Sequence, residues 1–326
     1  MRPAPDWTPF APLPGAPVLA PRTLAELVDG GQSFRWRRLA DDTWLGHWSD
    51  HIARLRLTPA GALEWSAPPE SAARTAAALP VYLFGNYTPA SVDALPWRSD
   101  PHLARCLAAF PGLTILRQPF GETLLGFLCS ATKQIIQIKQ MISLLAARLT
   151  PAPPPPIQPS FTPANPDPVC HLISDKLALT VGSKPDIFTE NRLPTWTELA
   201  AVSESDLRAC LLGFRARYIH QTARFIADHP GWLEETEAAP YPEAKARLMT
   251  LPGVGEKVAD CVLLFGAGKL EAFPVDTWII KAMARRYGLD DWTPVQIAHF
   301  GRTHFGPHAG LAQQYLFAYE RAQAKE

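Results

Sequence analysis

The chain has 326 residues, 47% of them hydrophobic and 19% charged, and its 31 basic side chains balance 31 acidic ones. These values are typical of a globular protein of two or three domains, and no apolar run reaches the roughly 18 residues of a membrane span. The net charge of zero argues against a nucleic-acid binder that depends on a global positive field, so any DNA contact must use local basic groups, backbone amides and helix ends.

Five scattered cysteines, with no Cys-x-x-Cys pair, favour reduced thiols and argue against a structural zinc or a four-cysteine iron–sulfur cluster. The N-terminal residues lack the apolar core of a signal peptide. We therefore expect a cytoplasmic protein.

The first hundred residues contain short β-prone runs at 44–48, 52–57 and 62–66. The second run alternates apolar and charged side chains, as a half-buried strand does. Turn-forming residues separate the runs, so the sequence predicts an antiparallel sheet. A helix is expected over 71–79.

Helical periodicity begins near residue 100, and the stretch 122–149 predicts two helices. The proline-rich stretch 150–168 cannot be helical and is interpreted as a loop within one helical domain. Helices are expected again from about 195 to the C-terminus.

A glycine-rich turn containing Gly253 and Gly255 precedes one of these helices. Glycine can take positive φ and leaves no Cβ in the way of a neighbour. The helix N-terminus beyond it presents unpaired N–H groups that suit a phosphate. The same residues could also form no more than a tight turn between two helices.

Lys257 lies just after this turn and four residues before Cys261, at the edge of the apolar stripe of the predicted helix. Partial burial and the positive helix end disfavour the ammonium form. An amine placed in this way is a plausible nucleophile for a sugar C1′. An ordinary surface lysine is the alternative.

Asp276 precedes another predicted helix, where an aspartate commonly acts as the N-cap and contributes about 1 kcal/mol. A capping carboxylate is held rigidly, and its charge can also stabilise a cationic sugar. A last helix is predicted from about Gly306 to Ala322, with Gln313 and Phe317 on one face. The amide could read a base edge and the ring could stack on a base, although ordinary packing is the commoner use of such a pair.

Taken together, these residues resemble the helix–hairpin–helix DNA glycosylases and, more narrowly, the eukaryotic-type 8-oxoguanine DNA glycosylase family. Further matching blocks run almost end to end: 31–36 (Gly-Gln-Ser-Phe-Arg-Trp), 116–118, 127–130, 212–218 and 306–313. The resemblance implies an α+β fold, with mostly α-helical helix–hairpin–helix glycosylase domains and an N-terminal antiparallel β-sheet domain. It places the β-rich domain at 1–115, the helical region at 116–326 and the hairpin at about 245–262.

The family's site residues carry over to matching positions of this chain. Lys257 would be the Schiff-base nucleophile and Asp276 its acidic partner. The carbonyl of Gly31 would accept a hydrogen bond from N7–H of 8-oxoguanine, a proton that guanine lacks, and the unpaired acceptor would cost guanine roughly 1–3 kcal/mol. The remaining base contacts would be a sandwich between Cys261 and Phe317 and a polar contact from Gln313.

Contacts with the rest of the duplex are also implied by the resemblance. Phe214 would be the wedge in bent DNA, and Arg215 would contact the cytosine left unpaired. Gly253 and Gly255 would hold the DNA backbone, where hairpin carbonyls could also bind a monovalent or divalent cation. No other cofactor or metal is implied, and the expected partner of this monomer is double-stranded DNA containing 8-oxoguanine.

Three positions depart from the family pattern. Thr132 replaces an asparagine that fills the gap opposite the cytosine, and Gln137 replaces an arginine that reads this base. Selectivity for the opposite base is therefore expected to be relaxed. Trp278 replaces a phosphate-contacting histidine, and its indole donates one hydrogen bond without charge.

The function expected on this basis is a bifunctional DNA glycosylase and lyase for 8-oxoguanine, acting through a lysine Schiff base and β-elimination. One alternative is a monofunctional alkyl-base glycosylase of the same superfamily, which would lack the lysine. The other is a non-catalytic protein that binds damaged DNA.

Overall fold

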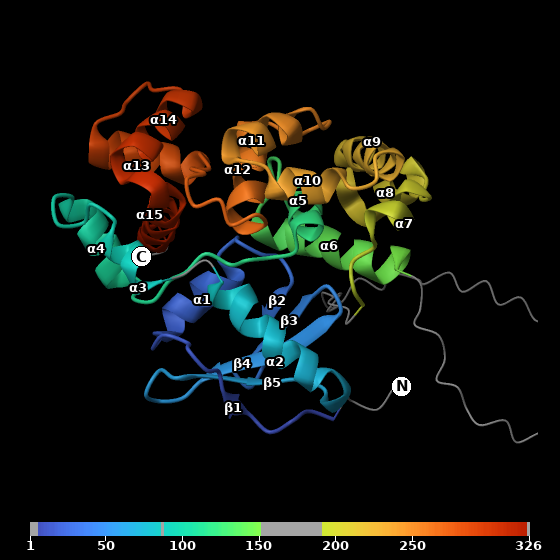
Figure 1. Cartoon of the computed structure of the whole chain (residues 1–326), viewed down its shortest axis with the longest axis horizontal. Helices are drawn as coiled ribbons and strands as arrows, with labels where there is room; N and C mark the ends of the chain where they lie inside the picture. The colour runs from blue at the N-terminus through green and yellow to red at the C-terminus, as the bar shows by residue number, and fades with distance from the viewer. Residues whose placement is uncertain (1–5, 86–87, 151–190, 325–326) are drawn as a thin grey trace, which may run out of the picture.

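The computed structural model describes residues 6–85, 88–150 and 191–324, so the predicted proline-rich loop lies outside the described residues except for Thr150. Figure 1 shows a β-sheet with two helices on the lower side of the molecule and a larger set of helices above it. The fold is α+β, as expected.

The sheet has five strands in the order β1-β5-β4-β3-β2, and all its neighbours pair antiparallel. The strands are β1 (Ala11–Pro12), β2 (Trp36–Arg38), β3 (Trp44–Trp48), β4 (His51–Leu57) and β5 (Leu63–Ser66). The three predicted runs are confirmed as β3, β4 and β5. The two- and three-residue strands β1 and β2 were not predicted, because they are too short to show an alternating pattern.

The helices continue this order along the chain. They are α1 (Pro21–Asp29), α2 (Pro69–Phe84), α3 (Pro89–Asp93), α4 (Pro101–Ala109), α5 (Phe120–Leu128), α6 (Ile135–Leu149), α7 (Trp196–Ala200), α8 (Glu204–Leu207), the π-turn η1 (Arg208–Leu212), α9 (Arg215–Asp228), α10 (Trp232–Ala238), α11 (Tyr241–Met249), α12 (Glu256–Phe265), α13 (Thr277–Tyr287), α14 (Pro294–Phe305), the 3₁₀ turn η2 (Gly306–His308) and α15 (Ala309–Gln323). The predicted pair of helices in 122–149 is confirmed as α5 and α6. The last helix begins at Ala309 because residues 306–308 form the 3₁₀ turn.

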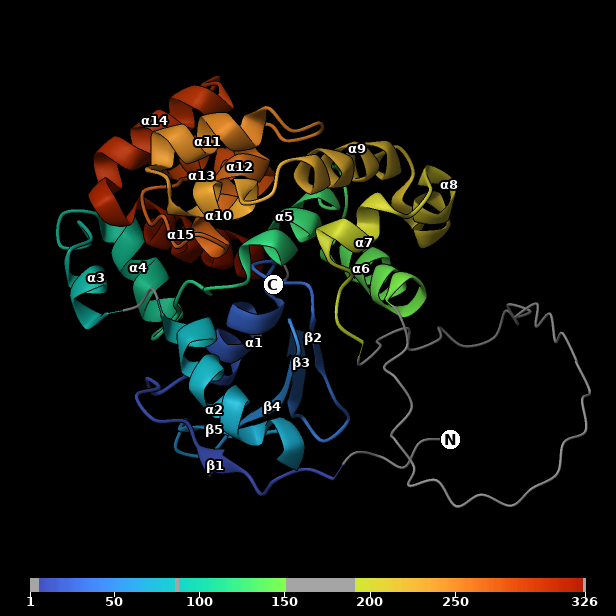
Figure 2. The ribbon, with the colours of Figure 1, turned by 45° about the vertical axis from the view of Figure 1, so that its right-hand side comes forward.

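The helix α4 follows the sheet in sequence but packs beside α15, as Figures 1 and 2 both show. Asp100, the N-cap of α4, explains part of this packing. Its Oδ2 accepts hydrogen bonds from the Tyr287 hydroxyl at 2.8 Å and from His304 Nε2 at 3.1 Å. Early and late parts of the chain therefore share one helical layer, and the domain boundary near residue 115 stays a prediction.

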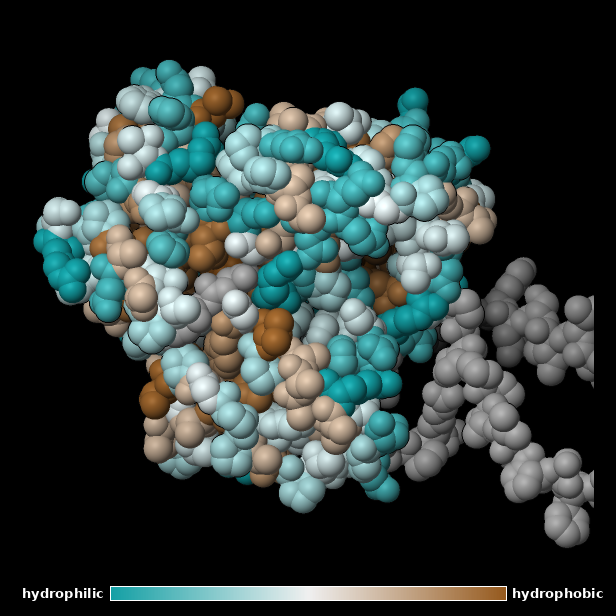
Figure 3. All heavy atoms as spheres, in the orientation of Figure 1, coloured by the Kyte–Doolittle hydropathy of each residue, from teal (hydrophilic) through white to brown (hydrophobic). Residues whose placement is uncertain are grey.

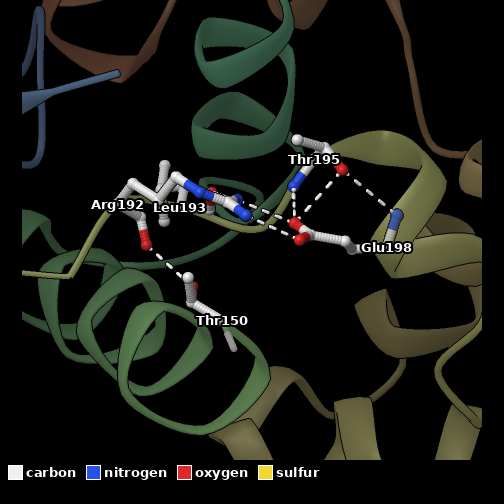
Figure 4. A network of polar contacts seen from close by, with 5 residues as sticks. All are labelled: Thr150, Arg192, Leu193, Thr195 and Glu198. Carbon is white, nitrogen blue, oxygen red and sulfur yellow. Dashed lines mark hydrogen bonds and ion pairs between the residues drawn. The ribbon is translucent and has the colours of Figure 1, made fainter. Parts of the chain in front are cut away.

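A polar network joins the end of α6 to the start of α7 (Figure 4). The Thr150 hydroxyl donates to the Arg192 carbonyl at 2.8 Å. Arg192 also binds both carboxylate oxygens of Glu198, at 2.6 and 2.7 Å, and this contact lowers the pKa of Glu198 to about 2. The hydrogen bond between Thr150 and Arg192 therefore holds the residues on either side of 151–190 next to each other, and Glu198, which also forms the capping box of α7 with Thr195, anchors Arg192 to that helix.

The surface seen in Figure 3 is mostly hydrophilic, and its hydrophobic side chains appear as separate spots. Within the described ranges, no helix is long and apolar enough to cross a membrane.

Candidate active site

A cleft of about 920 Å³ lies between the sheet-bearing N-terminal part and the helices α6, α12, α13 and α15. Its lining includes eight of the predicted site residues: Gly31, Thr132, Lys257, Cys261, Asp276, Trp278, Gln313 and Phe317. These residues come from distant parts of the chain, and the fold brings them to one cavity. Four predicted DNA contacts lie outside its lining: Phe214, Arg215, Gly253 and Gly255.

Lys257 lies in the first turn of α12 and is half-buried. Its Nζ is 3.5 Å from the Ser130 hydroxyl and 5.1 Å from the centre of the Phe127 ring. Phe127 in turn packs edge-on against Phe34 and stacks on Phe265. An aromatic floor and one hydroxyl thus surround the amine, which faces the cleft and forms no ion pair with the described residues.

Asp276 is the N-cap of α13, as predicted. Its Oδ1 accepts hydrogen bonds from the backbone N–H groups of Trp278 at 3.0 Å and Ile279 at 2.9 Å. Burial raises the pKa of Asp276 above its ordinary value, although these amides and the charge of Lys257 act in the opposite direction. The carboxylate is therefore fixed in orientation and electrostatically coupled to the candidate nucleophile.

Gly31 lies in the turn after α1, with φ of +111°. A Cβ at this position would lie 3.1 Å from the Ile135 side chain of α6, so both conformation and space favour glycine. The next residue fixes the turn: the Gln32 amide donates to the Thr114 carbonyl at 3.0 Å and accepts from the Leu116 N–H at 2.9 Å. Gln32 thus holds Gly31 at the edge of the cleft.

Cys261 and Phe317 line the cleft from α12 and α15, as the resemblance implies. Burial raises the pKa of the Cys261 thiol to about 11, so this wall is uncharged near neutral pH. Gln313 is buried, and its Oε1 has no hydrogen-bond partner in the part of the chain that the structure describes. An unpaired buried acceptor facing a cavity suits a ligand that donates a hydrogen bond.

Two further polar residues of α15 line the cleft and were not predicted, Gln314 and Arg321. Arg321 donates to the Gly30 carbonyl, binds Glu26 at 2.8 Å and lies 5.5 Å from the Phe317 ring. It thereby ties the turn that carries Gly31 to α15. The available signal was its spacing, since Arg321 follows Phe317 by four residues and Gln313 by eight, on the same helix face.

The helical hairpin consists of α11, residues 250–255 and α12. Gly253 has φ of +80°, and a Cβ there would lie 2.5 Å from the Tyr218 ring. Gly255, the N-cap of α12, has φ of −102° and open space around the position of a Cβ. Gly253 is therefore required by the fold itself, whereas Gly255 leaves the uncapped helix end accessible.

Arg215 lies differently from the expectation that it faces an unpaired cytosine. Its side chain is only 2% exposed, and its guanidinium donates to the carbonyls of Leu212 and Ala131 and, at 3.1 Å, to the Thr132 hydroxyl. Its Nε has no hydrogen-bond partner among the described residues, and the contact with cytosine stays a prediction. Phe214, by contrast, is exposed and packs edge-on against Tyr218, as a wedge residue could.

The remaining departures also have defined positions. Gln137 is exposed near the start of α6, and its Oε1 accepts from the Gln134 N–H at 3.2 Å. Trp278 lines the cleft, and Lys281 Nζ lies 5.2 Å from its ring. The relaxed choice of opposite base stays a prediction, which single-turnover excision opposite each of the four bases would test.

Within the described ranges, no group of three or more His, Cys, Asp and Glu side chains could hold a metal ion.

Residues 173–303 match the model of the HhH-GPD superfamily of base excision DNA repair proteins. The fold agrees with this class: a 3-methyladenine DNA glycosylase from Archaeoglobus fulgidus superposes with a TM-score of 0.65 at 16% identity, over 97% of this chain and 99% of the other. The lysine hairpin and the capping aspartate both lie within the matched residues, so this part of the chain is similar to helix–hairpin–helix DNA glycosylases.

Within this class, the chain is similar over nearly its whole length to glycosylases that are also lyases. It is 29% identical to the N-glycosylase/DNA lyase OGG1 of Arabidopsis thaliana, over 91% of this chain and 77% of the relative. It also superposes with a TM-score of 0.75 and 28% identity on the 8-oxoguanine glycosylase/lyase of Clostridium acetobutylicum, solved with DNA containing cytosine opposite 8-oxoguanine; 92% of each chain is covered.

Proposed function

We propose that this chain is a bifunctional 8-oxoguanine DNA glycosylase and lyase that acts in base excision repair. The proposal depends on one observation: Lys257, Asp276 and Gly31 all line the same cleft. The similarity to glycosylase/lyases over nine-tenths of the chain supports the same reaction. As a DNA-repair enzyme it would work in the cytoplasm, at the nucleoid if the cell is bacterial.

The proposed reaction begins when the damaged nucleotide leaves the stack and enters the cleft. The Lys257 amine forms a bond to C1′ as the glycosidic bond breaks, and the base leaves with the bonding electrons and takes up a proton. The negative charge of Asp276 stabilises the positive charge that develops on the sugar. Opening of the sugar ring gives an imine, and loss of a C2′ proton then breaks the C3′–O bond, which cuts the strand 3′ to the lesion.

The other site residues have proposed roles that fit their positions. The Gly31 carbonyl would accept from N7–H of the base, Gln313 would contact its Watson–Crick edge, and Cys261 and Phe317 would cover its faces. The exposed turn at Gly255 would bind a phosphate through backbone N–H groups. No cofactor is needed for these steps, although hairpin carbonyls could hold a cation that strengthens DNA binding.

The test compares wild-type protein with Lys257→Gln on a duplex containing 8-oxoguanine. We expect wild-type protein to release the base and to form a covalent adduct with DNA when borohydride reduces the imine. Lys257→Gln should slow base release by more than about 1,000-fold and form no adduct, because the nucleophile is gone.

Other outcomes would contradict specific parts of the proposal. Base release without a trapped adduct in wild-type protein would indicate a monofunctional glycosylase. Tight binding without any base release would indicate a damage-binding protein. The same reaction in EDTA is expected to proceed, and its loss would show that a bound cation is required.

A further inference from the structure

Leu211 combines two features that rarely occur together. It lies in the π-turn η1 with φ of +63° and ψ of +17°, a left-handed conformation that is unfavourable for a leucine. Its side chain is nevertheless 54% exposed, so burial within the protein does not offset the strain. Strained residues of this kind concentrate at functional sites, where the conformation aims a side chain.

The neighbours of Leu211 form a repeated pattern of anchored and projecting side chains. Leu212 is fully buried and Arg215 is 2% exposed, so these two anchor the turn. Leu211 and Phe214 are each about half exposed and are two of the few large apolar side chains at the surface of the described residues. The turn therefore presents two apolar side chains to solvent, while Leu212 and Arg215 hold its backbone in place.

Arg215 fixes this turn relative to the cleft. One guanidinium nitrogen donates to the Leu212 carbonyl at 3.3 Å, and the other donates to the Ala131 carbonyl and the Thr132 hydroxyl. Thr132 lines the cleft and also has positive φ, +54°. A single guanidinium thus holds two left-handed turns together at the rim of the candidate active site.

We propose that Leu211 is a second wedge residue, which acts with Phe214 to fill the base stack where the damaged nucleotide has flipped out. This inference rests on the proposed function as a DNA glycosylase. Thr132 is short and its hydroxyl already accepts from Arg215, so it contributes little apolar volume to that gap. Apolar wedges such as leucine and phenylalanine stabilise kinked DNA by replacing the lost stacking, and Leu211 supplies this volume here.

The experiment measures the affinity of Leu211→Gly for two duplexes, one with a tetrahydrofuran abasic-site analogue opposite cytosine and one intact. Glycine adopts the left-handed conformation without strain, so the thermal midpoint should not fall. Affinity for the abasic duplex should fall about 10-fold, the equivalent of losing the burial of one leucine side chain. Affinity for the intact duplex should stay within about 2-fold, because the wedge acts only where the stack is open.

Three further variants separate the wedge from a structural role. Leu211→Asn tolerates the same φ but is polar, and it should lose as much affinity as Leu211→Gly. Leu211→Met keeps the apolar volume and should retain wild-type affinity within about 2-fold. Val295→Ala, which shortens an exposed apolar side chain on α14, should change neither affinity.

The outcomes distinguish failure of the wedge from failure of the proposed function. A wild-type preference for the abasic duplex that survives unchanged in Leu211→Gly and Leu211→Asn would overturn the wedge alone. Equal wild-type affinity for both duplexes would overturn the proposed function and the wedge with it. A 2-aminopurine placed beside the analogue gives an independent readout: its fluorescence should rise on binding wild-type protein and rise less with Leu211→Gly.

Discussion

Asp276 has two tasks that make different demands on its side chain. As the N-cap of α13 it needs only an oxygen that accepts from backbone N–H groups, and asparagine performs this task about as well. As the partner of Lys257 it needs a negative charge. A substitution that keeps the oxygen and removes the charge therefore separates structure from catalysis at a single residue.

We predict that Asp276→Asn leaves the free energy of unfolding within about 0.5 kcal/mol of the wild-type value and slows excision by about 100- to 1,000-fold. Burial raises the pKa of Asp276, so the carboxylate takes up its proton at a higher pH than an exposed aspartate, whose pKa is about 3.9. Since the ionised form is the active one, the wild-type rate should fall as the pH decreases through this raised pKa.

A single-turnover pH–rate profile measures this effect. In the wild-type protein the acidic decline should lie at higher pH than the titration of an exposed aspartate, and it should be absent from the Asp276→Asn profile. The same decline in both proteins would assign it to another group and contradict the role given to Asp276.

At the scale of elements, the hairpin of α11 and α12 is braced from behind. Asp260, buried in α12, accepts from the Tyr241 hydroxyl at 2.7 Å and pairs with Lys245 at 3.0 Å, both on α11. Lys245 also pairs with Glu256 at the start of α12. These contacts fix the two helices relative to each other, and the turn between them needs only to present its backbone.

The two hairpin glycines should therefore respond differently to alanine. Gly253→Ala introduces a Cβ into the Tyr218 ring at positive φ, and we expect a loss of about 2–3 kcal/mol in the free energy of unfolding. Gly255→Ala is compatible with φ of −102° and meets open space, so the loss should be smaller, about 0.5–1 kcal/mol, because alanine is a poorer N-cap than glycine.

For DNA binding we expect the larger effect from Gly255→Ala. A Cβ at Gly255 would obstruct the approach of a phosphate to the N–H groups of α12, and loss of one charge-assisted hydrogen bond corresponds to a roughly 10-fold weaker affinity. Urea unfolding measures the change in stability, and fluorescence anisotropy with a short duplex measures the change in DNA affinity. If Gly255→Ala binds DNA as tightly as the wild-type protein, the hairpin end is not a phosphate site.

The helices that carry Lys257 and Asp276 were predictable, because apolar periodicity and a capping residue are local signals. The strand β2 and the inward position of Arg215 were not. Arg215 meets Ala131, 84 residues away in the chain, and no spacing rule indicates that a basic side chain beside an exposed aromatic will turn into the protein to satisfy a carbonyl.

At the scale of the whole molecule, a buried charged group joins the sheet to the helices. Arg35, just before β2, contacts His47 Nδ1 on β3 and donates to the Asn191 carbonyl before α7 at 2.6 Å. Glu122 of α5 accepts from the Ser49 N–H at 2.9 Å and lies within electrostatic range of Arg35. Because Gly31 precedes this group by only four residues, the contact also holds one wall of the cleft against the helices.

His47 makes this contact sensitive to acid. Burial, and then the charge of Arg35, lower the pKa of His47 to about 3, whereas an unfolded histidine has a pKa of about 6.5. The unfolded chain therefore binds a proton that the folded protein excludes, and stability is lost as the pH falls from 6.5 toward 3. At pH 5 this single titration costs about 2 kcal/mol. Glu122 acts in the opposite direction, since burial raises its pKa and favours its protonated form in the folded protein.

We predict that His47→Gln removes part of the acid sensitivity of the fold. Urea unfolding at pH 7.5 and pH 5 gives the loss of stability on acidification for each protein, and this loss should be about 2 kcal/mol smaller in His47→Gln than in the wild-type protein. His299→Gln, a change at an exposed histidine of α14, is the matched control and should lose as much as the wild-type protein. Since the other carboxylates and histidines are common to all three proteins, their contributions cancel. An equal loss in His47→Gln would mean that His47 takes up its proton without breaking the contact between sheet and helices, and the acid sensitivity would then have to come from other groups.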